Sequence, residues 1–341
     1  MSLPLALRVA RLALACLVVA VPALAQDPAF ELEAKLRQGD SLLKTRQWEP
    51  ALKAYKEANA LADKKSPAAH LGMAKAYEGL KAHKSAADSC TEALKYTNGD
   101  KNLEAAAMNL RGTSNFALAD KFDDKRLKQA EDDFRAVLAI VEGPHIAQFN
   151  LGVALMKQRR DEEGTKELEA FVAKAGRAPE VANAKKFIAD PRRAREPFAP
   201  DFSFTTYDGE YLSLEDLRGK VVLVDFWATW CPPCVKATPG LKRIQDKLKG
   251  QPFVLLGISA DRNRSEWQSF IVGNSLTWHH YLDERGNLAR AFNIEVFPSY
   301  LLLDHDGIVR HTWRGYSPSV DGDIESKAKK LIKAITEKAP Q

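Results

Sequence analysis

Residues 221–234 read VVLVDFWATWCPPC, and the fold of the second half of the chain follows from them. The first six are almost all apolar or β-branched, as in a strand buried on both faces. The last four place two cysteines three residues apart, ahead of a helix predicted over 235–249. Proline is tolerated in the first turn of a helix, because the N–H groups there lack helical partners. The stretch therefore predicts a strand that delivers Cys231 and Cys234 to the start of a helix.

The spacing of Cys231 and Cys234 indicates a redox-active dithiol. Residues three apart on a helix project from one face, so the two sulfurs are close enough to bridge. Cys231 lies at the positive end of the helix dipole, which favours its thiolate, whereas Cys234 lies one turn deeper. We therefore expect an exposed sulfur that attacks and a protected sulfur that resolves the mixed disulfide.

Three other interpretations of the pair stay open at this point. A zinc site would need two further ligands, and the sequence holds no second pair. A purely structural disulfide would restrain little, because the loop that it closes is so small. A peroxidatic cysteine is the strongest rival, but peroxiredoxins carry Pro and Thr or Ser seven and three residues before it. This chain has Val224 and Ala228 there. We expect no metal and no other cofactor.

Further short apolar runs at 253–258 and 299–304 predict two more strands. Buried strands alternating with helices indicate an α/β domain with parallel pairings. The turns Asp208-Gly209 and Asp306-Gly307 predict hairpins, and hence added antiparallel strands. The expected second half is a mixed sheet flanked by helices.

The first half is repetitive and helical. Residues 30–175 are rich in Ala, Leu, Lys and Glu, and apolar residues recur three and four apart. Gly39, Gly72, Gly112 and Gly152 recur at intervals of 33, 40 and 40. After each comes a small-large-small or apolar triplet: Ala51, Tyr55, Ala58; Ala86, Cys90, Ala93; Ala130, Phe134, Val137; Gly164, Leu168, Phe171. This resembles the tetratricopeptide repeat, which implies an all-α array with a concave surface for a peptide or protein.

The match to that repeat is degenerate. The signature Trp is missing from the first helices, and residues 120–126 act as an insertion. We interpret the half as four repeats, closed by a helix at 179–189 and a charged, proline-bounded linker at 190–197. A plain helical bundle or spacer is the alternative. Cys90 occupies the position of the large residue in one repeat, so we expect it to be packed in the core.

Composition bounds the class of protein. The 341 residues suggest about two domains. They are 45% hydrophobic and 28% charged, which argues against a polytopic membrane protein and against disorder. The net charge of +5 is a small difference between 50 basic and 45 acidic residues, without a long basic block. We therefore expect no nucleic-acid partner.

The N-terminus has the order of a secretory signal. Arg8 and Arg11 precede an apolar run at 12–24, and Ala23-Leu24-Ala25 offers a cleavage site. We predict cleavage after Ala25 and a periplasmic or secreted protein, with membrane contact only if the signal is uncleaved. Cys16 leaves with the signal. A mature chain in such a compartment can keep disulfides.

The second half resembles the thioredoxin fold in its TlpA and ResA form, a redoxin. The resemblance is carried by Ala199-Pro200-Asp201-Phe202, the Asp208-Gly209 turn, residues 224–234 and Val296-Phe297-Pro298. It implies that Cys231 is the nucleophile and Cys234 the resolving thiol of a redox-active disulfide. Pro298 would be the cis-proline that offers backbone groups to an extended substrate. Asp225 would be the buried carboxylate that assists proton transfer at the deeper thiol, with its pKa raised by desolvation.

Other features depart from that family or extend it. Ala237 stands where many ResA relatives carry Glu, and no lysine in 253–260 matches the one beside thioredoxin's buried aspartate. Trp227, Trp230 and Phe297 would form an apolar rim for substrate. The alternative for Asp225 is a core carboxylate without a kinetic role.

We thus expect a signal peptide at 1–25, tetratricopeptide-like repeats at 27–177, a capping helix and linker at 178–197, and a thioredoxin-like domain at 198–341. The expected activity is reduction or exchange of protein disulfides, with a redox donor protein that recycles the pair. The repeats would bind a peptide or protein partner. The alternative is a repeat-based adaptor with an auxiliary or redox-sensing thioredoxin domain, and a thiol peroxidase ranks third.

Overall fold

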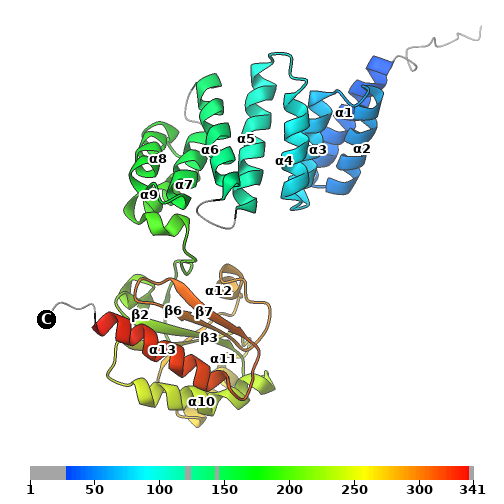
Figure 1. Cartoon of the computed structure of the whole chain (residues 1–341). Coiled ribbons are helices and arrows are strands. Elements are labelled where there is room, and N and C mark those ends of the chain that lie inside the picture. Colours follow the sequence, from blue (N-terminus) through cyan, green and yellow to red (C-terminus); the bar gives the residue numbers. More distant parts are fainter. Residues whose placement is uncertain (1–27, 120–123, 143–145, 338–341) are drawn as a thin grey trace, which may run out of the picture. The chain divides into compact units, whose positions relative to one another are not determined.

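The computed structural model describes residues 28–119, 124–142 and 146–337. The chain divides after Ala194 into two compact units, which are described separately (Figure 1). The expected signal at 1–25 and residues 120–123 of the expected insertion lie outside the described residues. Within them, no helix is long and apolar enough to cross a membrane.

The first unit is a run of helices in which each packs against the next. They are α1 (Pro28–Lys44), α2 (Trp48–Leu61), α3 (Pro67–Gly79), α4 (His83–Leu94), α5 (Lys101–Leu118), α6 (Lys125–Ile140), α7 (Ile146–Lys157), α8 (Asp161–Ala175) and α9 (Glu180–Ala189). The predicted all-α array is confirmed, and its successive helices fit the repeats.

The repeated glycines allow close packing within helix pairs. A Cβ added at Gly112 on α5 would lie 2.7 Å from the ring of Phe134 on α6. A Cβ at Gly152 on α7 would lie 2.6 Å from Leu168 on α8. The glycine of one helix thus makes room for the large residue of its neighbour, which explains the period seen in the sequence. Cys90 is fully buried, as expected, and burial raises the pKa of its thiol to about 12.

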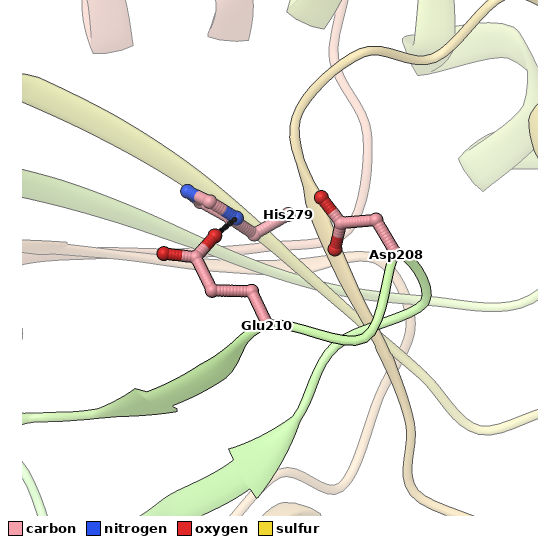
Figure 2. A group of neighbouring side chains, drawn as sticks. All are labelled: Asp208, Glu210 and His279. Atoms are coloured by element: carbon pink, nitrogen blue, oxygen red, sulfur yellow. Dashed lines mark ion pairs between the residues drawn. The ribbon is translucent and has the colours of Figure 1, made fainter.

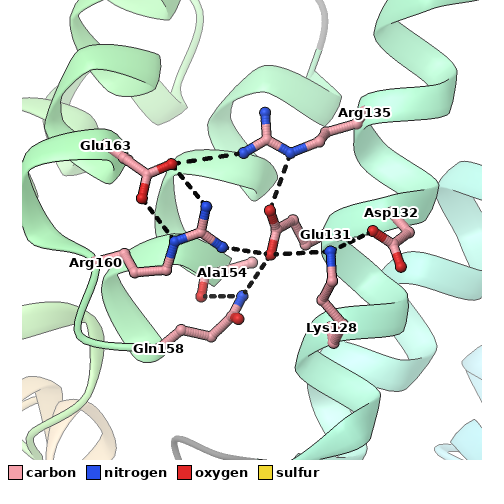
Figure 3. A network of polar contacts seen from close by, with 8 residues as sticks. All are labelled: Lys128, Glu131, Asp132, Arg135, Ala154, Gln158, Arg160 and Glu163. Carbon is pink, nitrogen blue, oxygen red and sulfur yellow. Dashed lines mark hydrogen bonds and ion pairs between the residues drawn. The ribbon is translucent and has the colours of Figure 1, made fainter.

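One buried carboxylate joins α6 to the turn between α7 and α8 (Figure 3). Glu131 is 2% exposed and accepts hydrogen bonds from Arg160 (2.7 Å), Arg135 (3.0 Å) and Gln158 (3.3 Å). Burial opposes ionisation of Glu131, but these donors outweigh it and lower its pKa. The contact fixes α6 against the start of α8.

The segment between the two units is shorter than the sequence suggests. Residues Pro191–Ala194 form a 3-10 helix, and Ala194 is buried in the cluster that holds Val153, Leu168 and Phe171. Half of the expected linker at 190–197 therefore belongs to the first unit, because one alanine in the charged run is apolar enough to pack.

The described part of the second unit holds a five-stranded mixed sheet with helices on its faces and a separate two-stranded sheet of β1 and β2. Its strands and helices are β1 (Ser203–Thr205), β2 (Tyr211–Ser213), β3 (Val221–Trp227), α10 (Pro232–Leu248), β4 (Phe253–Ser259), α11 (Arg264–Gly273), β5 (His279–Leu282), α12 (Asn287–Ala291), β6 (Ser299–Leu303), β7 (Val309–Arg314) and α13 (Val320–Thr336). In the five-stranded sheet the strand order is β5-β4-β3-β6-β7. Strands β3, β4 and β5 are parallel, and β6 pairs antiparallel with both β3 and β7.

Both hairpin predictions are confirmed. Strands β1 and β2 pair antiparallel around Asp208-Gly209, and β6 and β7 pair around Asp306-Gly307. Gly209 and Gly307 have φ of +87° and +74°, a region that favours glycine.

Alternation along β3 divides the core into two layers. Val221, Leu223 and Trp227 pack in one cluster with α10, α11 and α13. Val222, Val224 and Phe226 pack in the other with β1, β2 and Phe292. The two cysteines belong to the first cluster, so their chemistry is set on the α10 face of the sheet.

Candidate active site

The dithiol lies where β3 passes into α10. Cys231 is the N-cap of α10, and Pro232 and Pro233 occupy its first positions. Cys231 and Cys234 form a disulfide with their Cα atoms 5.3 Å apart, and the N–H of Cys234 donates to the Sγ of Cys231 at 3.3 Å. The sequence prediction of two sulfurs on the first helical turn is confirmed.

The expected contrast in exposure is wrong for this oxidised state. Cys231 is 5% exposed and Cys234 3%, so neither residue is open to solvent. Both residues pack in the cluster that α10, α11 and α13 form over the sheet. What distinguishes the sulfurs is position: only Cys231 stands at the helix end, where an N–H group points to its sulfur.

The loop before Cys231 is held by a residue that the sequence did not single out. Asp261, 2% exposed and just beyond β4, accepts the backbone N–H of Thr229 at 3.0 Å and its hydroxyl at 2.6 Å. The hydroxyl of Ser259 donates to the same carboxylate at 2.5 Å. No spacing relative to the cysteines marks Asp261, because strand pairing and not sequence distance brings it there.

Asp225 lies on the same face of β3 as Leu223 and Trp227, beneath the dithiol cluster. It is 4% exposed, and burial raises its pKa to about 8. The expected direction of the shift is thus confirmed. Its Oδ1 has no hydrogen-bond partner among the described residues, which is unusual for a buried polar atom.

Of the expected substrate-contact residues, Trp230 directly precedes Cys231, and Phe297 packs against the cluster that holds both cysteines. The Phe297–Pro298 peptide bond is cis. The carbonyl of Pro298 accepts the N–H of Gly315 at 2.7 Å, so it is already engaged, whereas no backbone hydrogen bond involves Phe297 in the part of the chain described. The rings of Phe297 and Trp230 meet edge to face, 5.9 Å between centroids.

Trp230 is 61% exposed, as expected of a rim residue. Trp227 is only 4% exposed, so it is core and the expected three-residue rim reduces to two. Trp230 also borders a pocket of about 410 Å³, lined further by Ala260, Asp261, Arg262, Asn263 and Glu266. The exposed indole thus touches both a pocket and the residue before the cis-proline, and it can contact an extended chain.

A separate polar group lies at the edge of the sheet (Figure 2). Asp208 and Glu210 come from the β1–β2 turn and His279 begins β5. The Nδ1 of His279 lies 3.4 Å from Glu210, and one donor atom of each residue lies within 4.8 Å of the others. The carboxylates are exposed and this geometry alone assigns no metal.

Similarity to known proteins agrees with the geometry. The family model described as Redoxin matches residues 193–332. Thiol-disulfide oxidoreductase ResA of Geobacillus kaustophilus is 30% identical over 117 residues, which cover 34% of this chain and 67% of the relative. The chain belongs to the redoxin family. Its redoxin unit is a thiol-disulfide oxidoreductase domain.

Other relatives match the same unit. Thioredoxin-like protein YneN of Bacillus subtilis is 33% identical over 114 residues, 33% of this chain and 66% of the relative. The crystal structure of a thiol:disulfide interchange protein of Chlorobium tepidum is 27% identical, covers 40% of this chain and 97% of its own, and has a TM-score of 0.37. The redoxin thus spans about two thirds of the curated relatives' length, and the helical array precedes the family match.

Proposed function

We propose that this redoxin reduces or exchanges disulfides of protein substrates through Cys231 and Cys234. The observation that supports this proposal most strongly is the disulfide between Cys231 and Cys234 at the N-terminus of a helix, in a unit that also has a buried carboxyl and a cis-proline. The helix end stabilises a thiolate at Cys231, because its free N–H groups and dipole favour negative charge.

The proposed reaction has two steps. The thiolate of Cys231 attacks a substrate disulfide, which forms a mixed disulfide and releases one substrate thiolate. Asp225, as carboxylate, takes the proton of the Cys234 thiol, and the new thiolate attacks the sulfur of Cys231. The second substrate thiolate leaves, the substrate disulfide is reduced and Cys231–Cys234 is oxidised. A donor protein supplies two electrons to restore the dithiol.

We propose that Trp230, Phe297 and Pro298 receive the substrate chain. Trp230 supplies exposed aromatic surface, which gives contact area at low entropic cost. Because the Pro298 carbonyl is engaged by Gly315, the backbone of Phe297 is the group free to bind an extended segment.

We propose further that the protein works outside the cytoplasm and that its helical array recruits a partner. The order of charges, apolar run and small residues in 1–25 supports a signal cleaved after Ala25. The regular glycine packing of α5 to α8 supports a tetratricopeptide-like array. A bound partner would raise the local concentration of substrate at the dithiol.

Insulin reduction tests the enzymatic proposal. The wild-type protein should reduce insulin with a chemical or protein donor, and Cys231→Ser should abolish turnover. Undiminished turnover in Cys231→Ser would overturn the assignment. Negligible wild-type turnover, with partner capture that survives Cys231→Ser and Cys234→Ser, would instead favour the adaptor with an auxiliary redox domain.

A further inference from the structure

A row of polar and small residues crosses the sheet beneath the dithiol. The strand registers pair His280 with Gly257, Gly257 with Asp225, and Asp225 with Tyr300. Residues that are paired across neighbouring strands project from the same face. The row therefore lies on the α10 face, with Asp225 at its centre and His280 two strands away on the sheet edge.

This row and the neighbouring Trp227 hold buried polar atoms that have no hydrogen-bond partner among the described residues. His280 and Tyr300 are each 1% exposed. Both ring nitrogens of His280, the hydroxyl of Tyr300, the indole nitrogen of Trp227 and the Oδ1 of Asp225 have no partner among the residues described. A buried polar group without a hydrogen bond costs about 1–3 kcal/mol, so such a concentration in one layer calls for a functional reason.

Gly257 lets two of these nitrogens approach the strand next to Asp225. A Cβ at Gly257 would lie 2.8 Å from the Nδ1 of His280 and 3.2 Å from the Nε1 of Trp227. The rings of Trp227 and His280 are in contact, with centroids 6.1 Å apart. Both nitrogens thus occupy the space that a side chain at the position paired with Asp225 would fill.

Charged groups do not explain the state of Asp225. Burial alone raises the pKa of Asp225. Burial also lowers the pKa of His280 to about 3; the charge of His279 lowers that pKa further, and the charge of Asp208 raises it. Tyr300 faces Asp225 from β6. Burial raises the pKa of Tyr300, and the charges of Asp225, Asp321 and Tyr316 raise it further. At neutral pH the carboxyl of Asp225 is therefore protonated and the imidazole of His280 is neutral, while the indole of Trp227 can only donate.

We propose that His280 is a positioning residue for proton transfer at Asp225: across Gly257, its imidazole and the indole N–H of Trp227 are the polar groups that stabilise the carboxylate when Asp225 ionises. This inference rests on the proposed role of Asp225 and Cys234 in the resolving step. A carboxylate must exist there before the thiol proton of Cys234 can move to it. A buried carboxylate forms readily only where hydrogen-bond donors nearby stabilise its negative charge.

The test isolates the resolving step. The reduced protein is mixed with 5,5′-dithiobis(2-nitrobenzoate), so that attack by Cys231 releases one thionitrobenzoate and attack by Cys234 releases the second. The rate at which the second thionitrobenzoate is released is measured by stopped flow as a function of pH. The proteins compared are wild type, His280→Leu, His280→Gln and Gly257→Ala. The same histidine changes are made in Asp225→Asn. Infrared difference spectra of the carboxyl band of Asp225 report its titration directly, without turnover.

His280→Leu should raise the pH midpoint of the second rate by about one unit, which makes the step about tenfold slower below the midpoint. His280→Gln keeps an N–H donor and should restore most of the rate. Gly257→Ala should shift the midpoint in the same direction as His280→Leu. In Asp225→Asn, replacement of His280 should change nothing further.

Midpoints that stay at the wild-type value in His280→Leu and Gly257→Ala would overturn the inference. An equal shift in the Asp225→Asn background would also overturn it, because His280 would then act elsewhere. If His280→Leu does not fold, Gly257→Ala decides the matter. A wild type that fails to reduce insulin refutes the proposed function, whereas the infrared titration of Asp225 still decides the role of His280.

Discussion

Asp261 and Thr229 join two strand ends beside the dithiol: the carboxylate of Asp261 binds both the backbone N–H and the hydroxyl of Thr229, two residues before Cys231. The contact fixes the chain between β3 and α10. The geometry of the helix end, and with it the thiolate of Cys231, depends on this carboxylate.

Asp261→Ala should therefore destabilise the redoxin unit and slow attack by Cys231. Loss of hydrogen bonds to a buried carboxylate costs about 1.5–3 kcal/mol. Urea unfolding of the unit measures the stability, and the first release of thionitrobenzoate measures the attack. Glu266→Gln, in the exposed part of the same segment, is the control and should change both by little. Equal behaviour of the two variants would show that the contact is dispensable.

Asp225→Asn should stabilise the oxidised protein increasingly as pH rises. The pKa of Asp225 is raised in the folded state, so the unfolded chain loses this proton first. Folding stability then falls between the ordinary carboxyl pKa and about 8, by up to about 1.4 kcal/mol per pH unit. Unfolding curves at pH 5 and pH 8 should show the gain mainly at pH 8. A gain of the same size at both pH values would contradict the buried, protonated carboxyl.

Glu131→Gln should destabilise the helical array by about 2 kcal/mol at neutral pH, because three donors lose a charged acceptor (Figure 3). The pKa of Glu131 is lowered in the folded state. Its contribution is therefore present above the ordinary carboxyl pKa and is lost as pH falls through the lowered value. Glu163→Gln, on the exposed side of the network, should cost less. Chemical denaturation of the full chain checks both.

Cys90 should not react as a thiol in the native protein. It is fully buried with its pKa raised to about 12, and only the thiolate is a good nucleophile. In a reduced chain that lacks residues 1–25, a thiol reagent should modify Cys231 quickly and Cys90 only after unfolding in guanidinium chloride. Rapid modification of Cys90 in buffer would refute its place in the core.

The sequence predicts those parts of the site that are local in the chain. A few adjacent residues determine the geometry of the Cys231–Cys234 pair and of the Asp208-Gly209 and Asp306-Gly307 turns. The structure has all three as expected. The role of Asp225 could be predicted only from the resemblance to thioredoxin, since an aspartate in an apolar run fits several roles.

Two features could not be predicted because they depend on pairing between distant strands. Asp261 meets Thr229, and Gly257 separates His280 from Asp225, only once β3, β4 and β5 are in register. The burial of Cys231 differs from the expectation for a related reason: the helix end alone predicts exposure, whereas packing against residues of α10, α11 and α13 buries it.

Trapping the mixed disulfide tests the central claim most directly. The reduced Cys234→Ser variant, mixed with oxidised insulin, should form a covalent adduct that intact mass measurement detects and peptide mapping places on Cys231. The adduct should disappear on addition of reductant and should not form in Cys231→Ser. An adduct on Cys90, or none on Cys231 under conditions where thioredoxin forms one, would contradict the account.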